Sequence, residues 1–312
     1  MLAFLSQSCY NAITGSVWSS SPRWLTISHR PTILACLVLL LPDARGFVIQ
    51  KGVKMEHILS LSYGKDSLAC LGAIEKLGLP LDRIVHVEVW ATDTIHADFP
   101  EMVEFKEKAD AIIKDRYGIE VEHISSQVSY EEQFYKRRFN KKKEIDCIYG
   151  FPCIKGARCN DRLKTGLLNK INKGNICYIG IASDEPNRFH NLTDEKISPL
   201  VEAGWAEDMC REWCIKNDLL SPIYTTATRG GCWFCHNQSI SQLRLLRKNY
   251  PELWRLLLKW DTDSPVSFKP DGHTVHDFDL RFRIEDEGLI DQKATFRWSM
   301  LDDDLQYTIF KD

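Results

Sequence analysis

A short strand followed by a polar turn and an amphipathic helix is the feature that most constrains the fold of this chain. Residues 58–61 form an apolar run, residues 62–67 read Ser-Tyr-Gly-Lys-Asp-Ser, and apolar residues then recur at helical spacing as far as Leu77. A helix that begins directly after a buried strand presents free N–H groups and the positive end of its dipole to the turn. Gly64 lets the backbone approach an anion closely, and Lys65 adds a positive charge. The segment therefore predicts a phosphate-binding turn, in which the hydroxyls of Ser62 and Ser67 are further donors.

The Walker phosphate-binding motif does not describe this turn. That motif needs a Gly five residues before its Gly-Lys pair and a Ser or Thr directly after the Lys. Leu59 and Asp66 occupy those two positions. A different class of phosphate-binding loop is therefore expected.

The rest of the chain alternates between strand and helix patterns. Strands are expected at residues 84–90, 119–124 and 176–181, and helices at residues 99–117, from about residue 160, and at 206–217. Such repeats form right-handed crossovers, so the predicted fold class is α/β, a doubly wound parallel sheet with helices on both faces. Ligands of these folds bind beyond the carboxyl ends of the strands, which is where the opening turn lies. A smaller C-terminal helical, Cys-containing subdomain is expected, with helices at 240–249 and 251–261.

The first 54 residues differ from the rest in composition. They hold five Lys or Arg, a single acid and an apolar stretch, residues 33–41, that is too short to span a bilayer. Met55 stands directly before the first strand, and residues 51–54 back-translate to a purine-rich run that resembles a bacterial ribosome-binding site. We expect translation to begin at Met55 and residues 1–54 to be an N-terminal extension that is either assigned to the protein by mistake or disordered. The predicted organisation is thus 1–54, a nucleotide-binding domain at 55–225 and a helical subdomain at 226–312.

The charge of the chain argues against a globally basic nucleic-acid binder, since the net charge is −3 and becomes more negative without the first segment. One local exception is a run of cations interleaved with Phe139, namely Lys136, Arg137, Arg138, Lys141, Lys142 and Lys143. This run is either a solvated helix end or a contact for nucleic acid. No convincing secretory signal precedes the cysteines, which indicates a reducing, cytoplasmic protein without membrane association.

Four cysteines form a candidate metal site. Cys232 and Cys235 have the CxxC spacing that lets two thiolates reach one metal, and Cys153 and Cys159 form a second pair in another loop. Four sulfurs suffice for a tetrahedral Zn²⁺ or for a [4Fe-4S] cluster. The alternative is that these residues are free thiols.

The turn at residues 62–67 resembles the S-x-G-x-D-S loop of the PP-loop ATP pyrophosphatases, which cleave nucleotides between the α and β phosphates. Within that superfamily, the chain resembles the branch that contains phosphoadenosine phosphosulfate (PAPS) reductases. Asp93 and Thr94, followed by a Phe-Pro-Glu sequence at residues 99–101, are similar to an Asp-Thr-Gly turn that precedes Phe-Pro-Glu-Thr in those enzymes. The resemblance implies that Asp93 or Thr94 lies near the nucleoside. A helix N-cap region is the alternative, and it accounts for Asp98 but not for Asp93.

Residues 183–188 are similar to another loop at the nucleotide site of this superfamily. The resemblance implies that Arg188 bridges phosphate oxygens and that Asp184 or Glu185 positions Mg²⁺, a cation that prefers oxygen ligands.

Cys159, with Arg162 and Lys164 after it, resembles the second Cys and its basic followers in adenylylsulfate reductases that bind a [4Fe-4S] cluster. These enzymes carry an adjacent Cys-Cys pair, whereas this chain has Arg158 at the first position, so Cys153 has to be the fourth ligand and zinc stays an equal alternative. By the same resemblance, Arg162 and Lys164 help to hold phosphate or sulfate oxygens.

The position of the last cysteine, Cys235, distinguishes between two candidate reactions. Thiol-dependent PAPS reductases use a Cys in a Glu-Cys-Gly-Leu-His tail, and this chain has no cysteine after Cys235. The leading prediction is therefore an ATP-using enzyme in which Lys65, Asp66 and Arg188 act with Mg²⁺ while an unidentified acceptor is adenylylated and pyrophosphate leaves. The acceptor is sulfate or a nucleic-acid base activated for sulfur insertion. The alternatives are a diverged sulfonucleotide reductase that takes PAPS and releases sulfite, and a nucleotide-sensing or nucleic-acid-binding module with little turnover.

Overall fold

The computed structural model describes residues 55–140, 145–152, 158–190, 192–225 and 230–293. The expectation about residues 1–54 lies outside these ranges, and so do the predictions for Cys153 and for the three lysines at residues 141–143.

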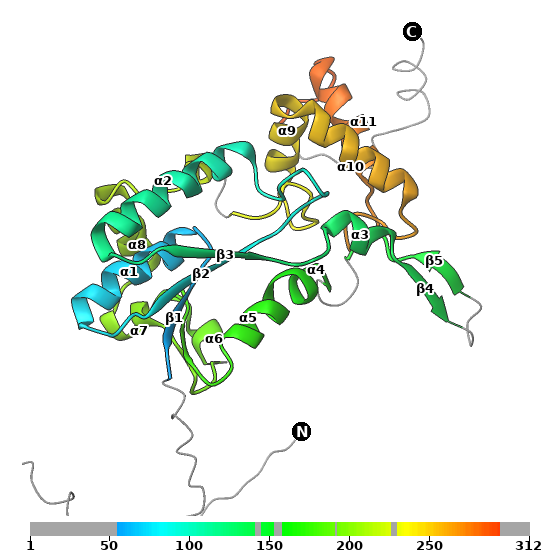
Figure 1. Cartoon of the computed structure of the whole chain (residues 1–312). Helices are drawn as coiled ribbons and strands as arrows, with labels where there is room; N and C mark the ends of the chain where they lie inside the picture. The colour runs from blue at the N-terminus through cyan, green and yellow to red at the C-terminus, as the bar shows by residue number, and fades with distance from the viewer. Residues whose placement is uncertain (1–54, 141–144, 153–157, 191, 226–229, 294–312) are drawn as a thin grey trace, which may run out of the picture. The chain divides into compact units, whose positions relative to one another are not determined.

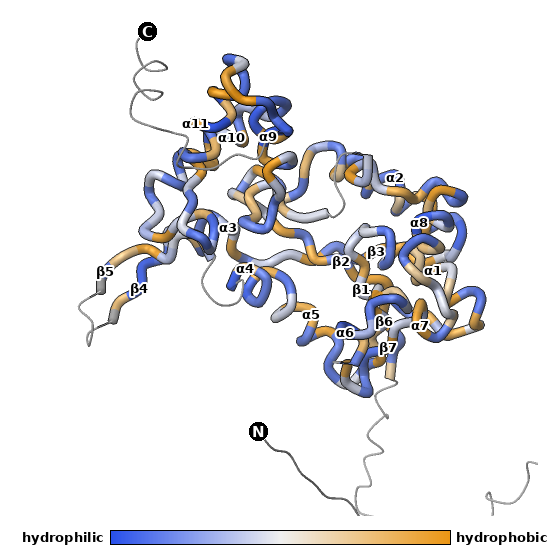
Figure 2. The backbone as a smooth tube through the Cα atoms, turned by 180° about the vertical axis from the view of Figure 1, so that it is seen from behind, coloured by the Kyte–Doolittle hydropathy of each residue, from blue (hydrophilic) through white to orange (hydrophobic). Residues whose placement is uncertain are grey.

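A five-stranded parallel sheet forms the centre of the fold (Figure 1). Its strand order is β3-β2-β1-β6-β7, and every neighbouring pair is parallel. The strands are β1 (His57–Leu61), β2 (Arg83–Glu88), β3 (Val121–Ser125), β6 (Ile176–Tyr178) and β7 (Lys196–Ile197). The predicted α/β fold with a parallel sheet is confirmed. Figure 2 shows hydrophobic stretches along β1 and β2, as expected of strands covered on both faces.

Helices cover both faces of this sheet. Four of them share one core cluster with β1 and β2, namely α1 (Lys65–Leu77), α2 (Pro100–Tyr117), α7 (Pro199–Ala203) and α8 (Glu207–Lys216). The π-helical turn η1 (Asp161–Thr165) and α5 (Gly166–Ile171) lie on the side of the sheet opposite α1 and α8 (Figures 1 and 2). Helix α1 ends where predicted, because Gly78 adopts the left-handed conformation that closes a helix.

The C-terminal part is helical, as expected. It contains α9 (Ile240–Asn249), α10 (Pro251–Asp263) and a helix that the sequence did not predict, α11 (Val275–Asp286). Their apolar sides meet in a second core cluster around Trp233, Trp254 and Trp260, and this cluster also contains Val89 and Phe134 from earlier in the chain. The division into domains near residue 225 remains a prediction.

A β-hairpin carries the described part of the basic run. The preceding helix α3 (Tyr130–Tyr135) begins with the predicted capping box between Ser129 and Glu132. Residues 137 and 138 then lie in β4 (Arg137–Asn140), which pairs antiparallel with β5 (Ile145–Ile148). The basic run thus begins at a helix end, since Lys136 is the exposed C-cap residue of α3, but it continues into a hairpin. Three of the remaining elements are α4 (Arg158–Asn160), α6 (Pro186–Phe189) and the 3₁₀ turn η2 (Pro222–Thr225).

Within the described ranges, no helix combines the length and the apolar character needed to cross a membrane.

Candidate functional site

The loop between β1 and α1 is held by its own serines. The Ser67 hydroxyl accepts hydrogen bonds from the backbone N–H of Ser62 (3.1 Å) and from the Ser62 hydroxyl (3.0 Å), and it donates to the carbonyl of Gly64 (3.0 Å). We expected both hydroxyls to donate to an anion, but they bond within the loop instead. The serines thus shape the loop backbone, and both of them line the cavity described below.

This loop lies at the point where the strand order reverses. Strands β2 and β3 extend the sheet on one side of β1, whereas β6 and β7 extend it on the other, and ligands of doubly wound folds bind at such a switch point. Gly180 follows β6 and approaches the first turn of α1 so closely that a Cβ atom there would lie 2.5 Å from the backbone nitrogen of Ser67. The close contact between the end of β6 and the first turn of α1 therefore needs glycine at this position.

A cavity of about 580 Å³ opens beside the loop. This volume lies in the range typical of small-molecule sites. Strand ends and the loop form one part of its wall, and three charged side chains from later in the chain also line it: Asp98, Lys164 and Arg188. Two of the cations predicted from the sequence thus reach one cavity with the predicted loop.

Lys65, in contrast, is not among the residues that line this cavity. Its ammonium lies 2.9 Å from the Asp66 carboxylate and 3.0 Å from that of Glu207, and only 12% of its side chain is exposed. Burial opposes the charged form, but these two acids outweigh it and raise the pKa of Lys65, which keeps the side chain charged. The backbone N–H of Lys65 donates to the hydroxyl of Tyr224 at 3.1 Å.

An acidic cluster adjoins Lys65. One carboxylate oxygen each of Asp66, Glu185 and Glu207 lies within 4.8 Å of the others. Burial, together with Glu207 and Glu185, raises the pKa of Asp66 against the lowering effect of Lys65. Arg188 pairs with Glu185 at 2.7 Å. These carboxylates have the oxygen chemistry that Mg²⁺ prefers, although two cations already neutralise part of their charge.

Asp184 makes a contact that the sequence did not predict. Its carboxylate accepts a hydrogen bond from the backbone N–H of Glu207 at 3.2 Å, at the first turn of α8. The side chain therefore caps a helix across the site, as a negative group at a helix N-terminus does. Its partner in the prediction, Glu185, is the one that joins the acidic cluster.

Lys164 links the cavity to the cysteines. It lies in the π-helical turn η1, a rare form of helix that is frequent at functional sites. Burial lowers the pKa of Lys164, but the negative charges of Cys232 and Asp98, with smaller effects of Cys159 and Cys235, outweigh it and raise the pKa. The charged ammonium is thus surrounded by groups that carry negative charge when ionised.

Three of the four predicted cysteine ligands are described, and they converge. Cys159, Cys232 and Cys235 are close enough for their charges to interact, and burial raises the pKa of Cys232 to about 12. The CxxC turn is anchored by Trp233, which is fully buried and stacks on Trp260 with ring centroids 5.4 Å apart. Within the described ranges, these three sulfurs do not all lie within 4.8 Å of one another. The predicted fourth ligand, Cys153, lies outside those ranges.

Other predicted residues lie away from the cavity. Asp93 and Thr94 are on an exposed turn and are not among its lining residues. Arg162 donates to the Gln133 side chain at 2.8 Å and lies over the Tyr149 ring, which places it at a different, smaller pocket.

The helix cap expected at Asp98 is not formed, so that prediction was wrong. Phe99 is the N-cap residue of α2, and no side chain caps it. Asp98 instead accepts a hydrogen bond from Lys106 at 2.6 Å and lines the cavity. From the sequence, the position of Asp98 two residues before Pro100 indicated only a cap for α2 and gave no sign that its side chain lines a cavity.

A buried polar network lies beneath the loop, and no sequence pattern predicted it. Tyr63 has a positive φ of 55°, a fully buried ring, and a hydroxyl that donates to Asp110 and lies 3.1 Å from His123 Nε2. Its ring also packs edge-on against His86, with centroids 4.7 Å apart. His86 and His123 lie on two neighbouring strands, and in the sequence each one looks like an ordinary strand residue. Only the pairing of the strands shows that the two histidines share one face of the sheet.

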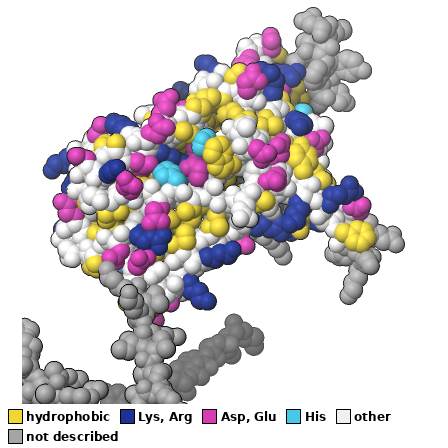
Figure 3. Space-filling view, in the orientation of Figure 1, with side chains coloured by type: hydrophobic (Ala, Val, Ile, Leu, Met, Phe, Trp, Pro, Cys, Tyr) yellow, Lys and Arg dark blue, Asp and Glu magenta, His cyan; other side chains and the backbone are white. Residues whose placement is uncertain are grey.

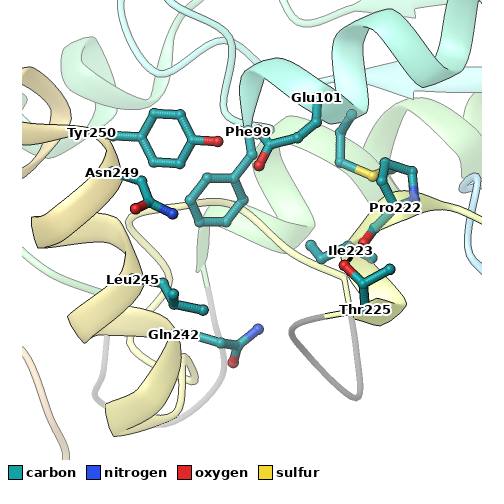
Figure 4. Close-up of a pocket in the computed structure, with 10 residues that line it drawn as sticks. Phe99, Glu101, Pro222, Ile223, Thr225, Gln242, Leu245, Asn249 and Tyr250 are labelled. Carbon is teal, nitrogen blue, oxygen red and sulfur yellow. Dashed lines mark hydrogen bonds between the residues drawn. The ribbon is translucent and has the colours of Figure 1, made fainter.

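A smaller, mainly apolar cavity of about 120 Å³ adjoins the first, because Met102 and Ile223 line both. Figure 4 shows side chains of α9 on one of its sides, residues of η2 on the other, and Phe99 between them. Tyr250 and Phe99 have ring centroids 5.5 Å apart, and burial together with Glu101 raises the pKa of Tyr250. Glu101 places a negative charge in the wall of this cavity, and a negative charge repels a phosphate. The cavity therefore suits an apolar group better.

Comparisons with known proteins give limited similarity. No protein-family model matches the chain. Over 151 residues, 46% of this chain, it is 30% identical to the uncharacterized nin region protein ORF290 of Escherichia phage lambda, and the chain spans only 50% of that relative. Among solved structures it is similar to the U34-tRNA thiolase NcsA from Methanococcus maripaludis with its [4Fe-4S] cluster, at 15% identity and a TM-score of 0.34, over 78% of this chain and 84% of that one. The function of this chain is therefore inferred from its own residues.

Proposed function

We propose that this chain is a PP-loop enzyme of the PAPS reductase-like branch that binds ATP in the larger cavity and cleaves it between the α and β phosphates. The observation that carries the proposal is the convergence of the loop at residues 62–67 with Lys164 and Arg188 at one cavity of about 580 Å³. The cavity lies at the switch point of a parallel sheet, beside the N-terminus of a thirteen-residue helix. Both features favour the phosphates of a nucleotide.

In this proposal, an acceptor oxygen bonds to the α-phosphorus while the bond to the bridging oxygen breaks and pyrophosphate leaves. No protein nucleophile is needed, since the chain acts by positioning and by stabilising the negative charge that develops on the leaving group. Lys164 and Arg188 are the cations that already line the cavity. Lys65 reaches the phosphates when its ion pair with Glu207 is exchanged for one with the triphosphate.

The proposal includes two metal-binding sites. Mg²⁺, which adds positive charge on phosphate oxygens when bound, would be held by Asp66 and Glu185 at the acidic cluster. Cys159, Cys232 and Cys235 would hold Zn²⁺ or a [4Fe-4S] cluster beside Lys164, with Cys153 as the predicted fourth ligand. A metal keeps thiolates ionised, and this offsets the raised pKa of the buried thiol of Cys232.

The experiment measures nucleotide binding and products with the purified chain. We expect ATP to bind, and we expect the Lys164→Met variant to bind it about tenfold more weakly, which is about 1.4 kcal/mol. Lys170→Met is the matched control, because Lys170 is exposed on the same helical segment and does not line the cavity. Lys65→Ala should lower the rate of pyrophosphate release by roughly 100-fold or more.

The products distinguish this proposal from its alternatives. AMP transfer with pyrophosphate release supports it. Sulfite released from PAPS in the presence of a thiol would instead indicate a sulfonucleotide reductase, and nucleotide binding without any product would indicate a sensing module. Release of ADP and phosphate, or equal ATP binding by both lysine variants, would contradict the assignment of the cavity.

A further inference from the structure

Three potential metal ligands meet on one face of the sheet, next to the loop. His86 and Glu88 are two residues apart on β2 and therefore share a face, and His123 on β3 is the direct register partner of His86. One ligand atom of each residue lies within 4.8 Å of the other two. His86 and Glu88 are buried, whereas 37% of the His123 side chain is exposed.

Hydrogen bonds on the outer side of each imidazole determine which nitrogen carries the proton. His86 Nδ1 lies 2.9 Å from the carbonyl oxygen of Leu61, and because a carbonyl only accepts, this nitrogen is the donor. His123 Nε2 donates in the same way to Asp110 at 2.8 Å, since the Tyr63 hydroxyl already gives its one hydrogen to that carboxylate. In the neutral form, His86 Nε2 and His123 Nδ1 therefore carry lone pairs.

Both lone pairs face the same carboxylate oxygen. Glu88 Oε2 lies 3.3 Å from His86 Nε2 and 3.6 Å from His123 Nδ1. In the described structure the buried His86 Nε2 has no hydrogen-bond partner. Three electron-rich atoms within 4.8 Å of one another, two of them neutral imidazole nitrogens without a proton to share, are stabilised by a positive charge between them.

The spacing fits a metal ion at that position. A tetrahedral ion with bonds of about 2.0–2.2 Å separates its ligand atoms by roughly 3.3–3.6 Å. The surrounding charge fits as well, because the hydrogen-bonded network holds three carboxylates, Glu88, Asp98 and Asp110, against the single ammonium of Lys106. Lys106 donates to both oxygens of Glu88, at 2.9 Å and 3.0 Å, and His96 Nδ1 lies 3.1 Å from Oε1, so these two residues orient the carboxylate. Lys106 therefore shares Oε2 with the site, but in the described part of the chain no hydrogen bond joins it to either imidazole.

We infer that His86 Nε2, Glu88 Oε2 and His123 Nδ1 form a binding site for a divalent transition-metal ion of the Zn²⁺ or Fe²⁺ class. Two imidazoles and one carboxylate are typical ligands of these ions and leave further coordination positions open, whereas Mg²⁺ and Ca²⁺ prefer oxygen alone. The Leu61 carbonyl and the Asp110 carboxylate supply the outer hydrogen bonds that metal-bound histidines make.

The most exposed ligand of the site is His123, whereas the other two are buried. His86 also lines the large cavity, and histidine side chains reach the surface over β3 next to acidic ones (Figure 3). Metal binding here does not depend on the proposed nucleotide chemistry.

The experiment uses the full chain, stripped of metal with a chelator and titrated with Zn²⁺ alone against a chromophoric competitor. We expect one zinc equivalent whose affinity falls more than tenfold in His123→Ala, and 10- to 100-fold in Asp110→Asn, which touches only the outer hydrogen bond. His276→Ala is the matched control, because this exposed histidine lies on α11 away from the site and should leave the affinity unchanged. Cys232→Ser should retain this equivalent, and that separates it from any metal bound at the cysteines.

Folding of each variant is checked by its thermal unfolding without metal. His123 is the ligand chosen for removal because it is the most exposed of the three. In the Cys232→Ser background, which removes metal from the cysteines, zinc should raise the melting temperature of the chain and of its His276→Ala variant, but not that of folded His123→Ala. Equal zinc affinity in the native chain and in folded His123→Ala, or loss of zinc in the cysteine variant alone, would overturn the inference.

Discussion

At the scale of single residues, Tyr63 and Gly180 hold the loop in place from two sides. Tyr63 accepts a left-handed backbone conformation that costs a non-glycine residue roughly 1 kcal/mol or more, and its fully buried ring holds it there. Gly180 is required for the opposite reason, because a side chain at this position would collide with the backbone of α1. Neither residue contributes a charge to the cavity, yet both determine where the charged residues lie.

The Gly180→Ala variant tests this view of the loop. Its new Cβ would meet the backbone of Asp66 and Ser67 at 2.5–2.8 Å, so the first turn of α1 would have to move. We expect the free energy of unfolding to fall by about 1–3 kcal/mol and ATP binding to weaken at least tenfold. Chemical denaturation and calorimetric titration measure the two effects.

Gly230→Ala is the control for stability. No atom lies within 4 Å of a Cβ built at Gly230, so the free energy of unfolding should stay within about 0.5 kcal/mol of that of the native chain. A Gly180→Ala protein as stable as this control, with native ATP affinity, would show that the close contact does not position the loop.

At the scale of elements, α9 and α11 are joined by ion pairs around a buried carboxylate. Glu285 of α11 accepts from Arg244 of α9 at 2.6 Å and from Arg281 at 2.9 Å, and 1% of its side chain is exposed. Burial raises the pKa of Glu285, but the hydrogen bonds from Arg244 and Arg281 outweigh it and hold the pKa below its ordinary value. The two helices thus depend on the ionised form.

The Glu285→Gln variant should reveal this dependence through pH. Because the pKa is lower in the folded chain than in the unfolded chain, the stabilisation is fully present above the ordinary value of 4.5 and is lost as the pH falls below it. We expect the variant to be about 2 kcal/mol less stable at pH 7, with a difference that shrinks at pH 4. Urea denaturation at both values measures it.

Glu252→Gln serves as the comparison for this pair. Glu252 forms an exposed ion pair on α10, with 76% of its side chain accessible, so its loss should change the stability by less than about 0.5 kcal/mol at either pH. The interpretation of Glu285 fails if its variant has the same stability difference at pH 7 and at pH 4.

At the scale of the whole molecule, the tertiary structure joins segments that are far apart in the chain. Cys159 stands just before η1, whereas Cys232 and Cys235 stand more than 70 residues later, and all three surround Lys164. The nucleic-acid contact predicted for the basic run remains a prediction. On the described hairpin, Arg137 pairs with Asp146, and Phe139 is 69% exposed.

A Cys232→Ser variant tests the cysteine site. Removing one thiolate of the CxxC turn should abolish the zinc or iron that copurifies at the sulfurs, because the remaining sulfurs no longer complete four ligands. Elemental analysis after anaerobic purification measures the metal, and visible absorbance distinguishes a cluster from zinc. Cys147→Ser, on β5, is the control and should keep its metal. Unchanged metal in both variants would leave the cysteines as free thiols.

The strand, turn and helix at residues 57–77 were predictable from the sequence because hydrophobic periodicity and helix-ending glycines act over a few residues. The parallel sheet followed from the alternation of strands and helices, and the cations Lys164 and Arg188 followed from motif resemblance. The missed elements are short, like β7, or mixed in polarity, like α11, so that local patterns are weak.

The sequence by itself thus determined the local elements, and it led to the prediction that the first turn binds an anion. Only the tertiary structure decided which side chains share a site: Asp98 with Lys164, Gly180 against Ser67, and His86 opposite His123. The physical reason is that strand register and the packing of crossovers join residues that are tens of positions apart. A shift of register by one residue would turn each histidine to the other face of the sheet, and no pattern within a single strand specifies its neighbour.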